Sequence, residues 1–121
     1  IQPRHATALG VARLYDALIA PGFLSAERRA DLAKQHAASD GPDPILGIPL
    51  RYGAGVELSL PPGIDFGPSA RALGHWGAGG ATGFADPEAG LAFGYVTGEM
   101  AAGMGSSARA RALVAALYDG L

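Results

Sequence analysis

Glycine is dense between residues 74 and 84, where the sequence GHWGAGGATGF has glycine at positions 74, 77, 79, 80 and 83. Each glycine gives entropy to the unfolded backbone and adds no side chain to packing, so this density weakens an ordinary strand. We therefore expect something to approach this backbone closely. A dinucleotide-binding loop fails as an explanation, because the G-x-G-x-x-G pattern starting at Gly77 needs glycine where the chain has Thr82. A tightly packed, bulged hairpin without chemistry remains an alternative.

Two helices are predicted in the first third of the chain. Apolar residues recur at three- and four-residue spacing over residues 7–19, Thr7 can cap the start, and a Pro-Gly pair ends the run. A second helix is predicted over residues 25–37, with Ser25 as its cap. Its apolar face is little more than Leu32 and alanines, so we expect it to be mostly exposed.

A strand is predicted over residues 51–60, because polar and apolar residues alternate there with a period of two. The polar face carries Arg51, Glu57 and Ser59, which we expect to be exposed. The buried face is expected to consist of Tyr52, Ala54, Val56, Leu58 and Leu60.

A three-strand meander and a final helix complete the prediction. The short segments 73–77, 81–85 and 91–97 are separated by turn residues and predict antiparallel strands. A serine-capped helix over residues 106–119 should lie across the sheet. Its apolar stripe consists of Leu113, Val114, Leu117 and Tyr118. The expected fold is therefore α+β, an antiparallel sheet flanked by three helices in a single segment over residues 1–121.

Composition and charge argue against several kinds of partner. The formal net charge is -2 and no run of Lys or Arg is present, so we do not expect nucleic-acid binding. The absence of Cys excludes disulfides, thiolate zinc sites and cysteine nucleophiles. The first residues, Ile1 to His5, lack an initiator Met and a signal-like pattern, and no apolar stretch is long enough to span a membrane. We favour a cytoplasmic location, and any export signal would lie upstream.

The stretch from Gly74 to Thr97 resembles the third-motif strand and following hairpin of the β-lactamase-related serine hydrolases. This group includes class C β-lactamases, family VIII esterases and D-aminopeptidases. Two upstream segments extend the resemblance: residues 7–15 are similar to the family's "TA…LAR-Y" helix, and residues 51–56 to its "YGLG" strand. The resemblance covers nearly the whole chain and implies the C-terminal part of a β-lactamase/transpeptidase-like fold.

The resemblance also implies roles for the residues of this strand. His75, Trp76 and Gly77 occupy the position of the family's third motif, Lys-Thr-Gly or His-x-Gly, which borders the active site. His75 would project towards the nucleophile or the substrate, and the N–H of Ala78 would stabilise the oxyanion. Gly77 and Gly79 would let substrate lie against the strand. No metal or cofactor is implied.

Two alternatives stay open at this strand. His75 could be a half-exposed strand residue whose ring is bonded to a backbone carbonyl, without a chemical role. Trp76 alternates to the opposite face of the strand, which favours core packing over substrate stacking.

The family's nucleophile motif, Ser-x-x-Lys, and its Tyr-x-Asn motif are both absent, and the chain contains no Asn. We therefore expect the nucleophile to lie outside these residues and the chain alone to be inactive on its ester, amide or β-lactam substrate. A histidine is a weaker cation than the family's lysine at neutral pH, which would favour esters over anionic β-lactams. A non-catalytic binding module built on the same scaffold is the alternative. Residues 91–97 should form an open edge that pairs with the missing N-terminal part, a completing chain or another copy.

Overall fold

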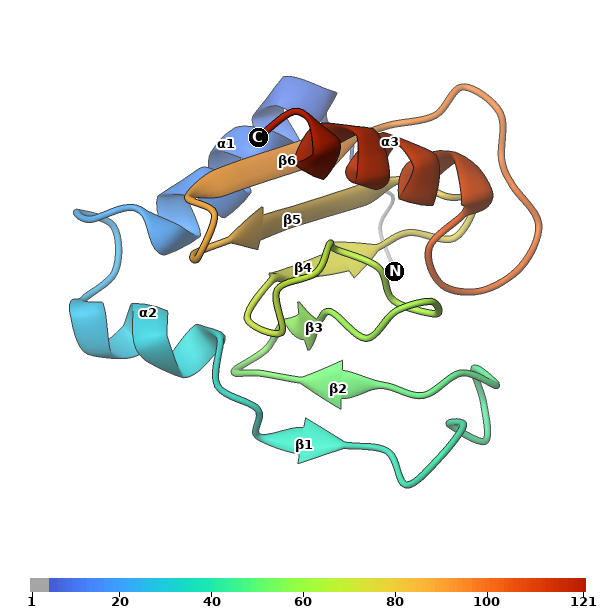
Figure 1. Cartoon of the computed structure of the whole chain (residues 1–121), viewed down its shortest axis with the longest axis horizontal. Coiled ribbons are helices and arrows are strands. Elements are labelled where there is room, and N and C mark those ends of the chain that lie inside the picture. Colours follow the sequence, from blue (N-terminus) through green and yellow to red (C-terminus); the bar gives the residue numbers. More distant parts are fainter. Residues whose placement is uncertain (1–4) are drawn as a thin grey trace.

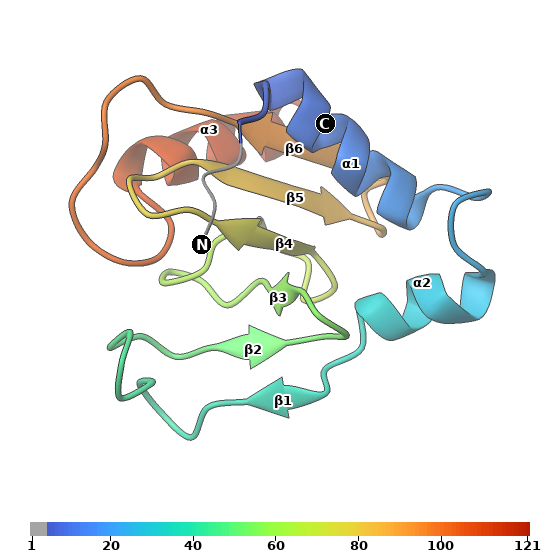
Figure 2. The ribbon, with the colours of Figure 1, turned by 180° about the vertical axis from the view of Figure 1, so that it is seen from behind.

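The computed structural model describes residues 5–121 and contains a six-stranded antiparallel sheet with the order β1-β2-β3-β4-β5-β6. Figures 1 and 2, which view the sheet from its two sides, show α1 and α3 on opposite faces. The elements are α1 (Ala8–Ile19), α2 (Ala26–Leu32), β1 (Ala37–Ala38), β2 (Arg51–Tyr52), β3 (Glu57–Leu58), β4 (Leu73–Trp76), β5 (Thr82–Asp86), β6 (Leu91–Tyr95) and α3 (Ala108–Asp119). The predicted α+β class is confirmed. The expectation about the first residues falls mainly on 1–4, outside the described part of the chain.

Helix α1 explains the glycines of the neighbouring strands. The side-chain oxygen of Thr7 accepts a hydrogen bond from the Gly10 N–H and caps the helix, as predicted. A Cβ at Gly83 would lie 2.3 Å from a methyl group of Val11, and a Cβ at Gly94 would lie 2.2 Å from a backbone oxygen of α1. Helix α1 is therefore the element that closely approaches the backbone at Gly83 of β5 and Gly94 of β6.

The prediction of one helix over residues 25–37 is wrong in its second half. Helix α2 is capped by Ser25 but ends at Leu32, and residues 37–38 form strand β1. The backbone oxygen of Leu32 lies so close to Gly53 that a Cβ there would be 2.0 Å away, so the segment with β2 packs against the C-terminal end of the helix. The chain then turns, and the His36 N–H donates to the carbonyl of Tyr52 at 2.8 Å.

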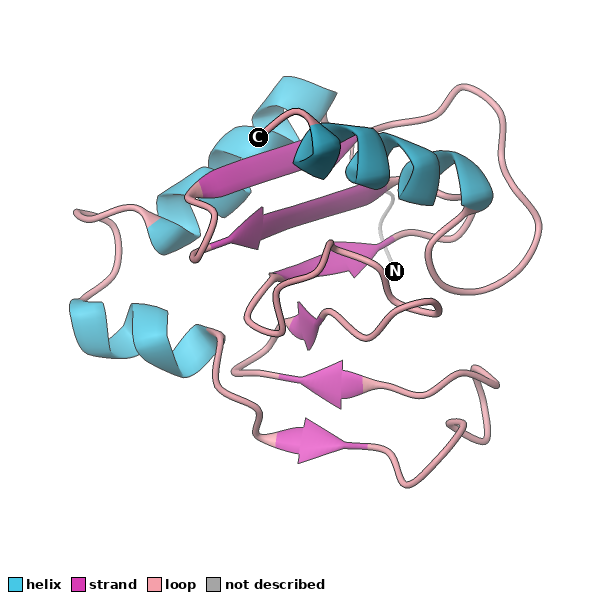
Figure 3. Cartoon of the chain, viewed as in Figure 1, coloured by secondary structure: helices cyan, strands magenta, loops and turns pink. Residues whose placement is uncertain are grey.

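The prediction of one continuous strand over residues 51–60 is also wrong. Strands β2 and β3 are a tight hairpin, with the Gly53 N–H donating to the Val56 carbonyl at 2.9 Å and a positive φ of 81° at Gly55. Figure 3 shows that loops make up most of the chain between α2 and β4. The expected exposed face is incorrect too, because Glu57 and Ser59 are buried. The Ser59 hydroxyl donates a hydrogen bond to the Gly67 carbonyl, so this buried hydroxyl has a partner inside the fold.

The meander from β4 to β6 agrees with the prediction to within two residues at each end. Buried Asp86 ends β5, and its Oδ1 accepts from the backbone N–H groups of Glu88 and Ala89, which forms the turn into β6. Its other oxygen accepts a 2.7 Å hydrogen bond from the Tyr118 hydroxyl of α3. Burial, together with that hydrogen bond, raises the pKa of Tyr118. This bond ties the meander to the final helix.

Helix α3 is capped by Ser107 and packs on the sheet as predicted, except that Leu113 is exposed rather than part of the buried stripe. The core therefore has two layers, one on each face of the sheet. The layer towards α3 contains Leu50, Ile64, Phe66, Ala72, Trp76, Phe84 and Val114. The layer towards α1 and α2 contains Ala33, Leu58 and Leu73, with Tyr15, Ile19, Leu32 and Val56 against it.

Candidate functional site

His75 projects from the middle of β4 towards the α1 side of the sheet. Leu73, two residues earlier on the same strand face, packs in the core layer beneath α1. The His75 side chain is 65% exposed, and its Nδ1 is hydrogen-bonded to the carbonyl oxygen of Trp76. Trp76 points the other way and is buried in the α3 layer, which confirms core packing for its ring. A backbone-bonded, exposed histidine fits a purely structural role as well, so other contacts must distinguish the two.

The turn after β4 presents a backbone N–H at Ala78. The Gly77 N–H donates to the Ala81 carbonyl at 2.7 Å, and the Gly80 N–H donates back to the Gly77 carbonyl at 2.9 Å. Ala78 lies exposed between these two bonds, and its N–H has no hydrogen-bond acceptor among residues 5–121. An exposed N–H at the end of a rigid strand is the type of donor that an oxyanion requires.

Different contacts explain why glycine occupies each of three positions in this turn. Gly79 is buried with a φ of 94°, and a Cβ there would lie 2.9 Å from two carbons of Met100. Gly80 has a φ of 101° and lies against the Ser107 side chain. Both are explained by the loop that leads to α3. A Cβ at Gly77 would make only ordinary contacts with Ala81, so the fold itself does not require glycine there. The predicted substrate contacts of Gly77 and Gly79 stay predictions.

An open groove of about 600 Å³ lies beside His75, between α1 and the ends of β4, β5 and β6. Its lining is largely apolar, with Val11 and Leu14 from α1 and Val96 from the end of the sheet. Leu14 is 57% exposed in this structure. His75 therefore stands at the edge of an apolar hollow that could receive an uncharged acyl group.

Glu57 is a buried neighbour of His75 that sequence reasoning missed. It lies directly across from Gly74 in the β3–β4 pairing, its side chain is 2% exposed, and its Oε2 is 4.0 Å from His75 Nδ1. Burial raises the pKa of the Glu57 carboxyl, while the charge of His75 and the nearby N–H groups of Trp76 and the Tyr52 hydroxyl act in the opposite direction. Despite this proximity, Glu57 Oε2 and Trp76 Nε1 have no hydrogen bond of ordinary geometry within the described residues.

The alternation of residues 51–60 predicts Glu57 on an exposed face, and the structure instead buries it. One signal in the sequence could have corrected this. Gly53 and Gly55 together mark a turn, and a turn between Tyr52 and Glu57 breaks the alternation on which the prediction depends.

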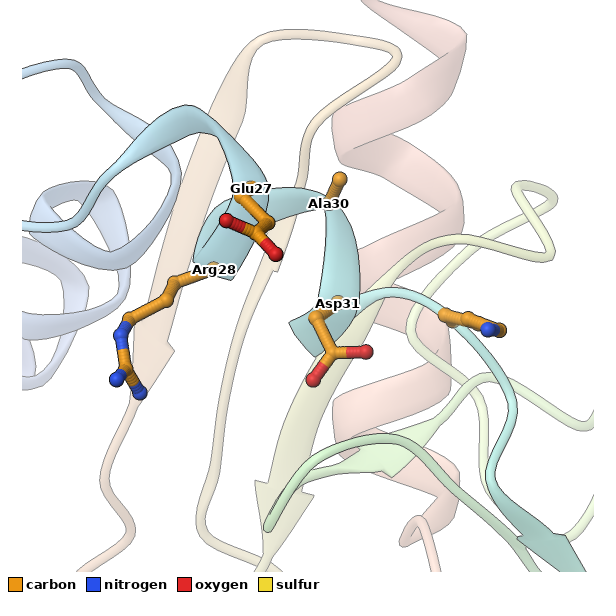
Figure 4. Close-up of a pocket in the computed structure, with 5 residues that line it drawn as sticks. Glu27, Arg28, Ala30 and Asp31 are labelled. Carbon is orange, nitrogen blue, oxygen red and sulfur yellow. The ribbon is translucent and has the colours of Figure 1, made fainter.

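A second hollow, on α2, has no comparable chemistry. It is lined by Glu27, Arg28, Ala30, Asp31 and Lys34. Figure 4 shows the side chains of Arg28 and Asp31 extending apart on the helix surface. Among residues 5–121, no three His, Asp or Glu side chains are grouped so that they could hold a metal ion. No helix in that range is both long and apolar enough to cross a membrane.

Several solved structures resemble the chain, and three of them show its family. A family VIII carboxylesterase has a TM-score of 0.81 and 30% sequence identity, over 93% of this chain and 31% of that one. A penicillin-binding protein homolog from Caulobacter crescentus has a TM-score of 0.86 and 30% identity, over 96% and 32%. EstA from Arthrobacter nitroguajacolicus Rue61a has a TM-score of 0.79 and 32% identity, over 94% and 32%. The chain thus spans about a third of the length of each of these proteins.

Two sequence comparisons were informative to different degrees. A search of curated proteins gives no match. The β-lactamase family profile, in contrast, matches residues 3–117, which is nearly the whole chain. With this match and the structural similarity, the predicted resemblance is confirmed: the chain belongs to the β-lactamase family and has the partial fold of its esterase-like hydrolases.

Proposed function

We propose that this chain forms one wall of the active site of a serine hydrolase that cleaves esters, amides or β-lactams through an acyl-enzyme. The proposal is carried by the juxtaposition of exposed His75 and the Ala78 N–H, which has no acceptor within residues 5–121, beside an apolar groove of about 600 Å³. A preorganised N–H of this kind stabilises the developing oxyanion by roughly 3–4 kcal/mol. The similarity to a carboxylesterase and a penicillin-binding protein homolog supports acyl chemistry.

In this proposal the nucleophilic serine and its base come from outside these 121 residues. The sequence has no Ser-x-x-Lys and no Asn for a Tyr-x-Asn motif, and it spans about a third of the structures it resembles. The nucleophile would approach from the α1 side, because His75 and the groove lie there. The exposed Leu14 of α1 would then be covered by the segment that carries the serine.

The groove favours substrates with an uncharged acyl group. Its largely apolar lining contains no Lys or Arg among residues 5–121, and His75 takes the place that the resemblance gives to the family's lysine. A neutral imidazole holds an anionic carboxylate less strongly than an ammonium group does. We therefore expect short esters to be hydrolysed in preference to β-lactams.

The edge of β6 is the place where a further strand would add. β6 is the last strand in the order, its residues are half-buried, and no strand within residues 5–121 pairs with its outer side. Open, partly apolar edges invite pairing with another chain. We expect the N-terminal part of the enzyme or a second polypeptide to occupy this edge.

The decisive test uses the complete polypeptide that contains this chain. Fluorophosphonate should label a serine outside the 121 residues, and short p-nitrophenyl esters should be turned over faster than a chromogenic cephalosporin. His75→Ala should lower kcat/KM by about a hundredfold, whereas His36→Ala, at an exposed site beside Asp31, should leave it unchanged. Clear preference for the cephalosporin would overturn the ester assignment. Absence of any labelled serine would favour the non-catalytic binding module.

Two measurements on the isolated chain complete the test. It should not turn over acyl substrates, and vigorous hydrolysis by the 121 residues alone would contradict an external nucleophile. Light scattering should reveal self-association through the open β6 edge, and a monomer at high concentration would count against the missing strand.

A further inference from the structure

The buried carboxylate of Glu57 is only partly satisfied within the described residues. It is 2% exposed, and its Oε2 receives no hydrogen bond within the described residues. A buried ionised carboxylate without a partner is strongly unfavourable, so such groups are normally paired or hydrogen-bonded. Within residues 5–121, the His75 ring is the basic group paired with Oε2, and its Nδ1 lies 4.0 Å away.

The environment of His75 assigns its ring protons. Nδ1 is hydrogen-bonded to the carbonyl oxygen of Trp76, which can only accept, so Nδ1 must carry the proton. The carboxylate of Glu57 lies near the same nitrogen and, when ionised, is also only an acceptor. Nε2 is on the other side of the ring from Nδ1 and is the atom left for the groove.

We propose that Glu57 is a positioning residue for His75: its buried carboxylate and the Trp76 carbonyl together hold the proton on Nδ1 and leave Nε2 to face the acyl site. The geometry of the Glu57–His75 pair is independent of the proposed function, whereas its effect on the reaction rests on that function. The charge partner of a histidine selects the ring tautomer and orientation, and that in turn sets whether Nε2 accepts or donates. Neutral His75 would therefore accept a proton or hydrogen bond from the reacting group.

The groups around the carboxylate support this role. Tyr52 on β2 and Trp76 on β4 act through hydrogen-bonding groups, and the Glu57 charge also raises the pKa of Tyr15 on α1, where burial is the larger cause. Among these neighbours, His75 is the only one that gains a positive charge on protonation. The same pair therefore stabilises an imidazolium if one forms during the reaction.

The first test reads the tautomer directly and needs no activity. In ¹⁵N NMR spectra at mildly alkaline pH, His75 should show the protonated nitrogen at Nδ1. His36 provides an internal control of opposite sense, because its Nε2 lies 2.9 Å from Asp31 Oδ1 and should carry the proton. A His75 ring protonated at Nε2 would overturn the assignment, whether or not the complete enzyme is active.

The second test measures the coupling of the two side chains. Because the charge of His75 opposes the effect of burial, His75→Gln should raise the pKa of the Glu57 carboxyl further, followed by the ¹³C signal of its Cδ. His36→Gln should leave that titration unchanged. An identical Glu57 titration in the wild type and His75→Gln would refute the pairing.

The third test concerns the reaction. In the complete enzyme, Glu57→Gln keeps the side-chain shape and should lower kcat roughly tenfold with little change in KM, since losing one charge-assisted contact is of that size. The pH profile of kcat should change as well, and Glu57→Asp should restore part of the rate. Equal kcat and pH profile in Glu57→Gln would show that the carboxylate does not act through His75.

Discussion

Replacing Gly94 by alanine should separate helix α1 from the sheet. Gly94 is paired with Gly83 across β5 and β6, and a Cβ at position 94 would lie 2.2 Å from the Ala8 carbonyl oxygen and 2.9 Å from the Ala12 nitrogen. Ordinary contact begins near 3.4 Å, so the helix must move by the difference, about 1.2 Å. Both obstructing atoms belong to the helix backbone and cannot rotate away as a side chain can.

The expected cost lies at the upper end of the range for overpacking, about 3 kcal/mol. For a chain of 121 residues the entropy of unfolding is about 0.25 kcal/mol per degree, so Tm should fall by about 12 °C. Urea unfolding followed by circular dichroism gives the free energy, and a thermal scan gives Tm. Gly98→Ala is the matched control, because a Cβ there meets nothing within 4 Å, and it should change stability by less than about 0.5 kcal/mol.

A second-site variant tests whether close packing of α1 against the glycines causes the loss of stability. A Cβ at Gly83 would be 2.3 Å from the Val11 side chain and 2.6 Å from Tyr15, so Val11→Ala should relieve part of the cost of Gly83→Ala. The same Val11→Ala should not rescue Gly94→Ala, whose obstruction is backbone. If Gly94→Ala costs no more than Gly98→Ala, close packing of α1 is not the reason for glycine in these strands.

Three further outcomes are expected. Tyr118→Phe removes the 2.7 Å donor to buried Asp86 and should cost about 1.5–3 kcal/mol in urea unfolding, so a cost near zero would show that the bond is not needed. Thr7→Ala removes the cap of α1 and should cost about 1 kcal/mol, with a matching loss of helical circular dichroism, and an unchanged spectrum would contradict the cap. The raised pKa of Glu57 means that its stabilising contribution is full below the ordinary value of 4.5 and is lost as pH rises through the folded-state value. Glu57→Gln should therefore gain stability relative to the wild type as pH rises above 4.5, and a pH-independent difference would refute the raised pKa.

The parts of the fold that the sequence predicts are those governed by local rules. Helix α1 begins one residue after its predicted start because the Thr7 cap is a short-range signal, and Ser107 caps α3 in the same way. The meander is bounded by turn residues such as Asp86, whose side chain bonds the next backbone N–H groups. Such signals lie within four residues of the structure they determine, so they can be read without knowing the fold.

The region from residue 33 to 60 could not be predicted in this way, because its structure depends on distant contacts. Strand β1 is two exposed alanines, and it forms only because Tyr52 and Arg51 pair with them. Helix α2 ends where Gly53 meets Leu32, which are far apart in sequence. No periodicity within residues 33–38 contains that information.

The same contrast between local signals and distant contacts applies to the residues of the candidate site. His75 and Ala78 can be proposed from a strand and turn whose residues resemble a family, whereas the alternation of residues 51–60, which the structure breaks, predicts Glu57 on a solvent face. A carboxylate buried at this position weakens the fold whenever it is ionised, and a glutamine of the same shape would avoid that cost. If folding alone determined the residue, glutamine would be the better choice. Residues that break a packing rule are expected where function requires it. The two predictions for Glu57→Gln, higher stability above pH 4.5 and a slower reaction, must therefore hold together. A variant that gained stability without losing rate would leave the carboxylate without a reason.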